Sequence, residues 1–200
     1  KTRLTLTTPR PIYLSAEKGM LSLVGSNVPV WGEVKSLADL IRANEWLLNS
    51  KEAKAYDTVI LDSVSELADN ILFAAKAGAK DGRKAHNDTY ELVVFNILNN
   101  WRDLPEKHVY MIAKERYDED KMTMVKQFKP SMPNGNLIRE LPYKFDFVFR
   151  MFQHLDVTTR QSSTWLQCHA DATAVAKDRS GKLAMYEPPN LGAIFTKAMQ

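Results

Sequence analysis

The segment from Tyr56 to Glu66 constrains the fold of this chain more than any other stretch. It reads Tyr-Asp-Thr-Val-Ile-Leu-Asp-Ser-Val-Ser-Glu, and residues 58–61 form a largely apolar run with no alternation. Such a run is typical of a strand that is buried on both faces, as in the middle of a parallel sheet. We expect this strand to end at Asp62 and Ser63, where a helix-forming segment with an apolar stripe begins.

Asp62 admits two interpretations. A carboxylate at the carboxyl end of a central parallel strand lies at the crevice where such sheets bind ligands. An apolar run that ends in Asp and continues with Ser is also the pattern of a Walker B strand, whose Asp holds the magnesium ion of a nucleoside triphosphate. The same side chain could instead cap the helix that follows. This stretch alone leaves both interpretations open.

The rest of the chain alternates between strand-like and helix-like segments. Besides the Asp62 strand, we expect strands at residues 12–17, 108–113 and 145–152, and helices at 36–49, 64–76 and 88–101, the first and last of these helices capped by Ser36 and Asp88. Residues 78–87 and 118–136 are expected to be loops, the second with room for a hairpin at 122–128. Residues 163–169 and 172–176 should be antiparallel strands, before a turn at 177–181 and a closing helix at 191–199.

This alternation predicts an α/β fold with a mainly parallel sheet, helices on both faces and antiparallel strands at the C-terminal edge. Nothing marks a second domain, so residues 1–200 are expected to form one. The only cysteine, Cys168, leaves no internal disulfide and fits a reducing cytoplasm. No run reaches the 18 or so apolar residues of a membrane span, so no membrane partner is expected. The net charge of +3 is too small to indicate nucleic-acid binding by itself.

Three strand ends carry side chains suited to phosphate chemistry. Parallel strands place their functional groups at their carboxyl ends, and here these ends carry Glu17, Asp62 and Lys114. Hydrolysis of a phosphoanhydride needs a magnesium ligand, a group that positions water and a cation for the terminal phosphate. Asp62, Glu17 and Lys114 suit these roles in that order. Glu17 could also be a solvated turn residue, and Lys114 a surface residue.

The first two residues suggest where the phosphates would bind. A Walker A loop ends in Gly-Lys-Ser or Gly-Lys-Thr and passes directly into a helix. This chain opens on Lys1-Thr2, continues with helix-like residues and reaches the strand that ends at Glu17. We therefore expect the glycine-rich part of the loop to precede residue 1. In this interpretation Lys1 neutralises phosphate oxygens, and Thr2 holds magnesium together with Asp62.

Taken together, these motifs resemble the RecA-like ATPases of bacteriophages that act in single-strand annealing and recombination. The resemblance is carried by Lys1-Thr2 and by residues 11–19, 56–66, 128–130, 141–146 and 176–183. It covers nearly the whole chain and implies a RecA-like P-loop fold, ATP and Mg²⁺ as cofactors, and Glu17 as the base that activates water. In these phage proteins the third strand tip often carries His, whereas here it is Lys114.

A second resemblance concerns the turn at residues 177–181, Lys-Asp-Arg-Ser-Gly, which is similar to the Lys-Asn-Arg-Phe-Gly motif of RadA-type proteins. It implies that Lys177 and Arg179 act on the triphosphate of a neighbouring subunit, and therefore that copies of the chain assemble into a ring or filament. Without the resemblance these residues would be read as a basic turn.

The resemblance also implies single-stranded DNA as a partner, with a single-strand binding protein as a further candidate, in the cytoplasm of a bacterial host if the chain is phage-encoded. By analogy the DNA lies against the two loops at 78–87 and 117–136. Cations that track phosphates are what single strands require, and the candidates are Arg83, Lys84, Lys121, Lys126 and Lys129. Two other functions stay open: a non-catalytic nucleotide- or DNA-binding scaffold of the same fold, and a helicase-like motor.

Overall fold

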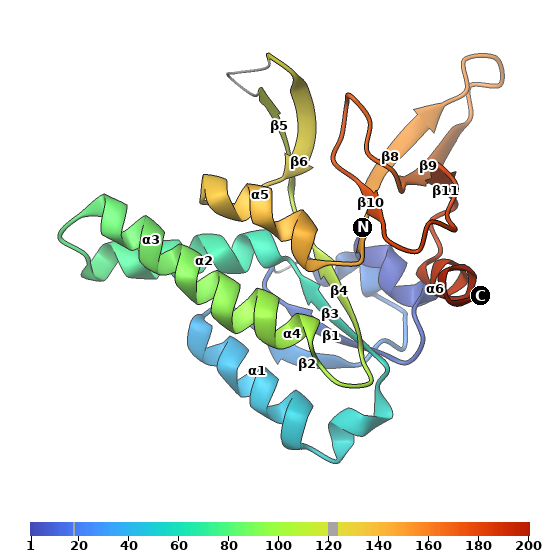
Figure 1. Ribbon diagram of the computed structural model, residues 1–200. Coiled ribbons are helices and arrows are strands. Elements are labelled where there is room, and N and C mark those ends of the chain that lie inside the picture. The colour runs from blue at the N-terminus through green and yellow to red at the C-terminus, as the bar shows by residue number, and fades with distance from the viewer. Residues whose placement is uncertain (18, 120–123) are drawn as a thin grey trace.

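The computed structural model describes residues 1–17, 19–119 and 124–200. At its centre lies a four-stranded parallel sheet in the order β2-β1-β3-β4 (Figure 1). The strands are β1 (Pro11–Ser15), β2 (Val30–Glu33), β3 (Thr58–Asp62) and β4 (His108–Ile112). Their register sets Ser15, Asp62 and Ile112 side by side at the carboxyl end. The three strand ends singled out by the sequence therefore meet at one edge of the sheet.

Strand β3 is the buried centre of this sheet, as its apolar run predicts. All five of its residues are buried. Because successive side chains in a strand point to opposite faces, Val59 and Leu61 enter the large core on one face and Ile60 enters a smaller one on the other. Both faces of β3 are thus covered, which explains why polar residues do not alternate along it.

One face of the sheet is covered by a layer of helices. This layer contains α1 (Leu37–Asn49), α2 (Val64–Gly78), α3 (Gly82–Val93), the π-helical turn η4 (Val94–Asn99), α4 (Asn100–Arg102) and α5 (Gly135–Lys144). Ser36 caps α1 as expected, in a reciprocal pair with Asp39. Trp101, Leu67 and Leu40 lie fully inside the core between these helices and the sheet.

The other face carries smaller elements. The short 3₁₀ helices η1 (Thr2–Thr7) and η2 (Met20–Leu23) cover it together with α6 (Leu191–Met199), while η3 (Glu52–Ala55) leads into β3. Leu4 of η1 packs with Leu191 and Ile194 of α6 in a second core. Thr7 Oγ1 accepts a hydrogen bond of 2.9 Å from the backbone N–H of Leu191, which ties the two ends of the chain together.

The remaining strands are antiparallel. Strands β5 (Glu115–Glu119) and β6 (Lys126–Pro130) form a hairpin, and β8 (Arg150–Leu155), β9 (Ser162–Gln167) and β11 (Tyr186–Glu187) form a sheet. The short strands β7 (Phe147–Val148) and β10 (Lys177–Asp178) pair with each other. Figure 1 shows the β5–β6 hairpin and the β8–β9 hairpin projecting from the body of the molecule on the same side. The predicted fold class is therefore confirmed.

Several predicted boundaries are wrong. Residues 78–87 are mostly helical, because α2 ends at Gly78 and α3 begins at Gly82. The N-cap of this second helix is Asp81, and Asp88 lies inside it. The expected strand at 145–152 is divided between β7 and β8. The expected strand at 172–176 has only an isolated bridge from Ala174 to Phe128. In place of a hairpin at 122–128, residues 115–119 pair with residues 126–130, and Met122 is outside the described residues.

Within the part of the chain that the structure describes, no helix combines the length and the apolar character needed to cross a membrane.

Candidate active site

The carboxylate of Asp62 is the buried centre of the candidate site. Its residue is only 5% exposed, at the carboxyl end of β3. One oxygen, Oδ2, accepts two hydrogen bonds, 2.6 Å from Thr2 Oγ1 and 2.8 Å from Tyr13 Oη. Hydrogen bonds from two hydroxyl groups stabilise a buried charge that would otherwise be costly. Residues from η1, β1 and β3 therefore converge on a single carboxylate oxygen.

Glu17 is held against the residue that follows Asp62. Ser63 Oγ donates a hydrogen bond of 2.5 Å to Glu17 Oε1. The backbone N–H groups of Ala16 and Glu17 both donate to the carbonyl oxygen of Asp62, at 2.6 and 3.2 Å. The side chain of Glu17 is 35% exposed, so it faces the solvent-accessible mouth of the site. The ends of β1 and β3 thus form one unit that carries both carboxylates.

The helix cap that Asp62 could have supplied is supplied by Ser63. Ser63 is the N-cap of α2, and its Oγ accepts a hydrogen bond of 3.2 Å from the backbone N–H of Glu66. The side chain of Asp62 instead accepts hydrogen bonds from Thr2 and Tyr13. Of the two interpretations that the sequence left open for Asp62, the capping role therefore belongs to its neighbour.

Two lysines lie at the tip of β4. Lys114 forms an ion pair with Glu66 of α2, and its Nζ lies 3.9 Å from Glu17 Oε1. The hydrogen bond that Lys114 donates to Glu66 raises the pKa of the lysine, which keeps its side chain cationic at neutral pH. Lys1 Nζ donates to the carbonyl oxygen of Ala113 at 2.8 Å, and its burial lowers the pKa of its ammonium group. The site thus holds the carboxylates of Glu17, Asp62 and Glu66 together with the two lysine side chains.

Two tyrosines were not anticipated from the sequence. Tyr13 is 1% exposed, and burial, followed by its hydrogen bond to Asp62, raises the pKa of its phenol. Burial and the nearby charge of Asp62 also raise the pKa of Tyr110. Tyr13 and Tyr110 both pair with Ile60 of β3, so they occupy one row of the sheet. A tyrosine inside a buried strand was the available signal, since its hydroxyl needs a partner.

The structure does not join every predicted residue to this site. Lys177 Nζ donates to the carbonyl oxygens of Phe145, at 2.7 Å, and Pro142, at 3.3 Å. Arg179 pairs with Asp146 at 3.0 Å, and both side chains are more than half exposed, at 72% and 65%. Lys177 therefore lies on β10 and Arg179 directly after it, both bonded to residues at or just beyond the end of α5, and their action on a neighbouring subunit stays a prediction.

The predicted DNA-contacting residues lie on two separate elements. Arg83 and Lys84 are exposed in the first turn of α3, where a loop was expected. Lys126 and Lys129 lie on β6 of the hairpin, with Lys126 Nζ 3.9 Å from Glu119. Lys121 is outside the described residues. This arrangement does not test whether these residues contact DNA, and the assignments stay predictions.

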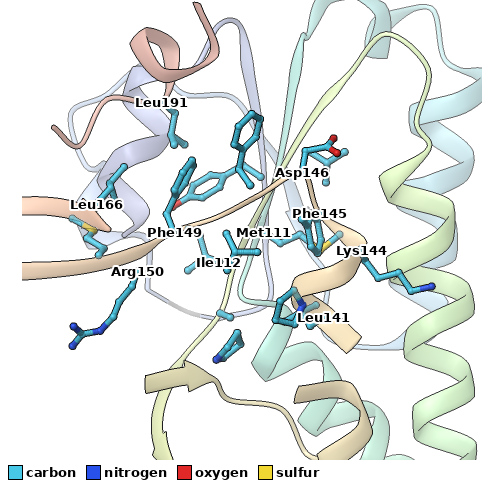
Figure 2. Close-up of a pocket in the computed structure, with 18 of the residues that line it drawn as sticks. Met111, Ile112, Leu141, Lys144, Phe145, Asp146, Phe149, Arg150, Leu166 and Leu191 are labelled. Atoms are coloured by element: carbon cyan, nitrogen blue, oxygen red, sulfur yellow. The ribbon is translucent and has the colours of Figure 1, made fainter. Parts of the chain in front are cut away.

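A cavity of about 530 Å³ runs along the edge of β4 that faces away from β3. It reaches Lys1 and Lys114 at the site, and its walls are mainly apolar. Figure 2 shows Met111 and Ile112 of β4 on one side, with Phe149 and Arg150 approaching from the chain that follows α5. This apolar cavity adjoins the polar site but does not contain the carboxylates of Glu17 and Asp62.

The polar residues suit a magnesium ion that also binds phosphates. Magnesium prefers oxygen ligands, keeps several waters, and is usually held by one or two protein groups plus substrate phosphates. Thr2 Oγ1 and Asp62 Oδ2 are adjacent oxygens of this kind. In residues 1–17, 19–119 and 124–200, no cluster of three or more His, Cys, Asp or Glu side chains could hold a metal by itself. The donor set therefore fits a shared protein–phosphate site.

A parallel sheet with acidic and basic side chains at its strand ends has the architecture expected of a P-loop nucleoside triphosphatase core. Comparison with models of known protein families matches residues 1–180 to the AAA domain. The chain belongs to this family of P-loop ATPases, which indicates nucleotide binding and ATPase activity. A search of curated proteins found no match.

Proposed function

We propose that this protein binds ATP with Mg²⁺ and hydrolyses it at the strand ends of β1, β3 and β4. The observation that carries the proposal is the pair of adjacent bonds at Asp62 and Ser63. Thr2 Oγ1 lies 2.6 Å from Asp62 Oδ2, and the next residue holds Glu17 Oε1 at 2.5 Å. A hydroxyl–carboxylate pair for the metal thus lies directly beside a carboxylate for the water.

The roles follow from the chemistry of each group. Thr2 and Asp62 would hold the magnesium ion, which when bound neutralises charge on the phosphate oxygens. Lys1 would face the β- and γ-phosphates. Glu17 would orient the attacking water and accept its proton, and Lys114 would stabilise negative charge on the terminal phosphate.

Single-stranded DNA is the partner that we propose for the β5–β6 hairpin. Tyr117 is 59% exposed and its ring centroid lies 4.7 Å from that of Phe128. Lys126 and Lys129 lie on the same hairpin. Aromatic faces beside cations are the combination that binds single strands without reading their sequence. In the resulting proposal the protein is a RecA-like recombination or annealing ATPase that assembles into a ring or filament, with Lys177 and Arg179 acting on the neighbouring subunit.

The test is Mg²⁺-dependent ATP hydrolysis by the full-length protein, with and without an oligothymidine strand. Hydrolysis that the strand stimulates is the expected result. Nucleotide binding without hydrolysis would instead favour the non-catalytic scaffold. Directional unwinding of a duplex, in place of annealing of complementary strands, would favour the helicase-like motor.

A further inference from the structure

Ser65 occupies an unusual position between the candidate site and the β5–β6 hairpin. It lies in the first turn of α2, three residues after Asp62, and is only 1% exposed. A serine hydroxyl buried this deeply needs hydrogen-bond partners, because an unsatisfied polar group in the interior is costly. Its partners determine which parts of the molecule it connects.

Both partners of Ser65 lie at the base of the hairpin. Ser65 Oγ accepts a hydrogen bond of 3.0 Å from the backbone N–H of Lys114 and donates one of 2.6 Å to the carbonyl oxygen of Ser131. The backbone N–H of Ser131 in turn donates to the carbonyl oxygen of Lys114 at 2.7 Å. These three bonds form a closed ring of Ser65, Lys114 and Ser131.

The ring sits where the hairpin begins and ends. Strand β5 starts at Glu115, directly after Lys114, and β6 ends at Pro130, directly before Ser131. Glu115 and Pro130 form the first pair of the hairpin ladder. The backbone of both hairpin strands is therefore anchored to one buried hydroxyl of α2.

The same turn of α2 also holds the candidate catalytic groups. Ser63 bonds to Glu17, and Glu66 pairs with Lys114. Residues 62–66 thus contact the proposed metal site, the proposed base, the hairpin base and the proposed phosphate cation within five consecutive positions. A shift of the hairpin that moved Lys114 would have to move either this turn or the ring of hydrogen bonds.

We propose that Ser65 is a positioning residue that couples the β5–β6 hairpin to the strand-end site. Ligand binding at the strand-end site changes the free energy of ligand binding at the hairpin through this ring. The reverse holds as well, because such coupling is reciprocal. The inference rests on the proposed function for the identity of the two ligands, ATP and single-stranded DNA. It goes beyond that function because it assigns the link between them to one buried side chain.

The variant that tests the link is Ser65→Ala in the full-length protein, with Ser131→Ala as its matched control. Ser131 takes part in the ring through its backbone N–H and carbonyl groups, so removal of its side chain leaves the ring intact. Ser65→Thr keeps a hydroxyl at position 65 and serves as the conservative variant.

The first readout is hydrogen exchange at residues 115–119 and 126–130, with and without a non-hydrolysable ATP analogue and Mg²⁺. We expect the nucleotide to slow exchange at the hairpin base about fivefold or more in the wild type and in Ser131→Ala. In Ser65→Ala this difference should disappear while nucleotide still binds. An unchanged hairpin in the wild type would overturn the inference, whatever the variants do, so the test survives if Ser65→Ala fails to fold.

The second readout is the ratio of hydrolysis rates with and without oligothymidine. The ratio should fall toward one in Ser65→Ala and return in Ser65→Thr, with the DNA affinity measured separately. If Ser65→Ala keeps the wild-type ratio, the inference is wrong. If the wild type neither binds nor responds to DNA but shows the nucleotide effect on the hairpin, the DNA part of the proposed function fails and the coupling stands.

Discussion

Ser63 Oγ lies 2.5 Å from Glu17 Oε1, one position beyond the buried carboxylate of Asp62. The same hydroxyl accepts a hydrogen bond from the backbone N–H of Glu66 and so begins α2. Ser63 therefore fixes the start of a helix and the orientation of the proposed base at the same time. This double role leads to a prediction that separates stability from catalysis.

Ser63→Ala should lower both the stability of the protein and the rate of hydrolysis. Loss of the N-cap should reduce the free energy of unfolding by about 1 kcal/mol. A Glu17 carboxylate that is no longer oriented should lower kcat by roughly ten- to a hundredfold. Urea denaturation and steady-state kinetics measure the two effects.

The matched control for this variant is Ser36→Ala. Ser36 caps α1 with a hydrogen bond of 3.2 Å from the backbone N–H of Asp39, on a helix that does not carry the site. It should lose similar stability with no change in kcat. Equal kcat values for Ser63→Ala and the wild type would show that Ser63 does not orient the base.

Tyr13→Phe tests whether the buried phenol stabilises Asp62. The hydrogen bond of 2.8 Å from Tyr13 Oη goes to a carboxylate that is 5% exposed. Loss of a hydrogen bond to a buried charged group should reduce the free energy of unfolding by about 2 kcal/mol. Tyr186→Phe is the control, because the Tyr186 residue is 45% exposed and should lose little. Equal urea midpoints for the two variants would contradict the assignment.

Glu66→Gln tests how Lys114 is shared between two carboxylates. Lys114 pairs with Glu66, and its Nζ lies 3.9 Å from Glu17 Oε1. Loss of the Glu66 charge should let Lys114 move toward Glu17, and the closer positive charge should make the Glu17 carboxylate a weaker base. We expect kcat to fall several-fold with little change in KM. Stability should change by less than about 1 kcal/mol, because the pair is partly exposed to solvent.

The direction of the Lys114 pKa shift predicts how the ion pair between Lys114 and Glu66 depends on pH. The folded pKa of Lys114 is raised above its ordinary value of 10.5, so the contribution of the pair is fully present below that value and is lost only as the pH rises through the folded pKa. The effect of Glu66→Gln should therefore be constant between neutral pH and about pH 9. A kcat difference that vanished within that range would show that another group is responsible. Glu45→Gln on α1 is the control for loss of an exposed carboxylate.

Mixed assemblies test whether Arg179 acts on a neighbouring subunit. Glu17→Gln and Arg179→Ala should each be nearly inactive alone. A mixture of the two should recover part of the activity, because some interfaces then pair an intact base with an intact Arg179. An inactive mixture would place Arg179 outside the shared site, where its ion pair with Asp146 would be its main role.

The central part of the fold could be predicted because its physical signals are local. The unalternated run at residues 58–61 indicated a strand buried on both faces, and Asp62 lies at its end as expected. The convergence of Glu17, Asp62 and Lys114 followed from parallel strands alone. Ser36 could be assigned as a cap because its partner, Asp39, lies three residues away.

Other parts depend on contacts between residues distant in the sequence. Residues 78–87 are polar and contain two glycines, which favours a loop, but Ala85 is fully buried and most of the segment is helical. The hydrogen bond from Tyr13 to Asp62 spans 49 positions, and the ring at Ser65 joins three separate segments. No local sequence pattern predicts such partners.

The most direct measurement compares the wild type with Glu17→Gln in the full-length protein, in nucleotide binding and in ATP hydrolysis. Removal of the proposed base should leave ATP affinity within about threefold and lower kcat by about a hundredfold or more. A variant that hydrolyses ATP at the wild-type rate would show that Glu17 does not activate water. It would also remove the catalytic role from the strand end of β1.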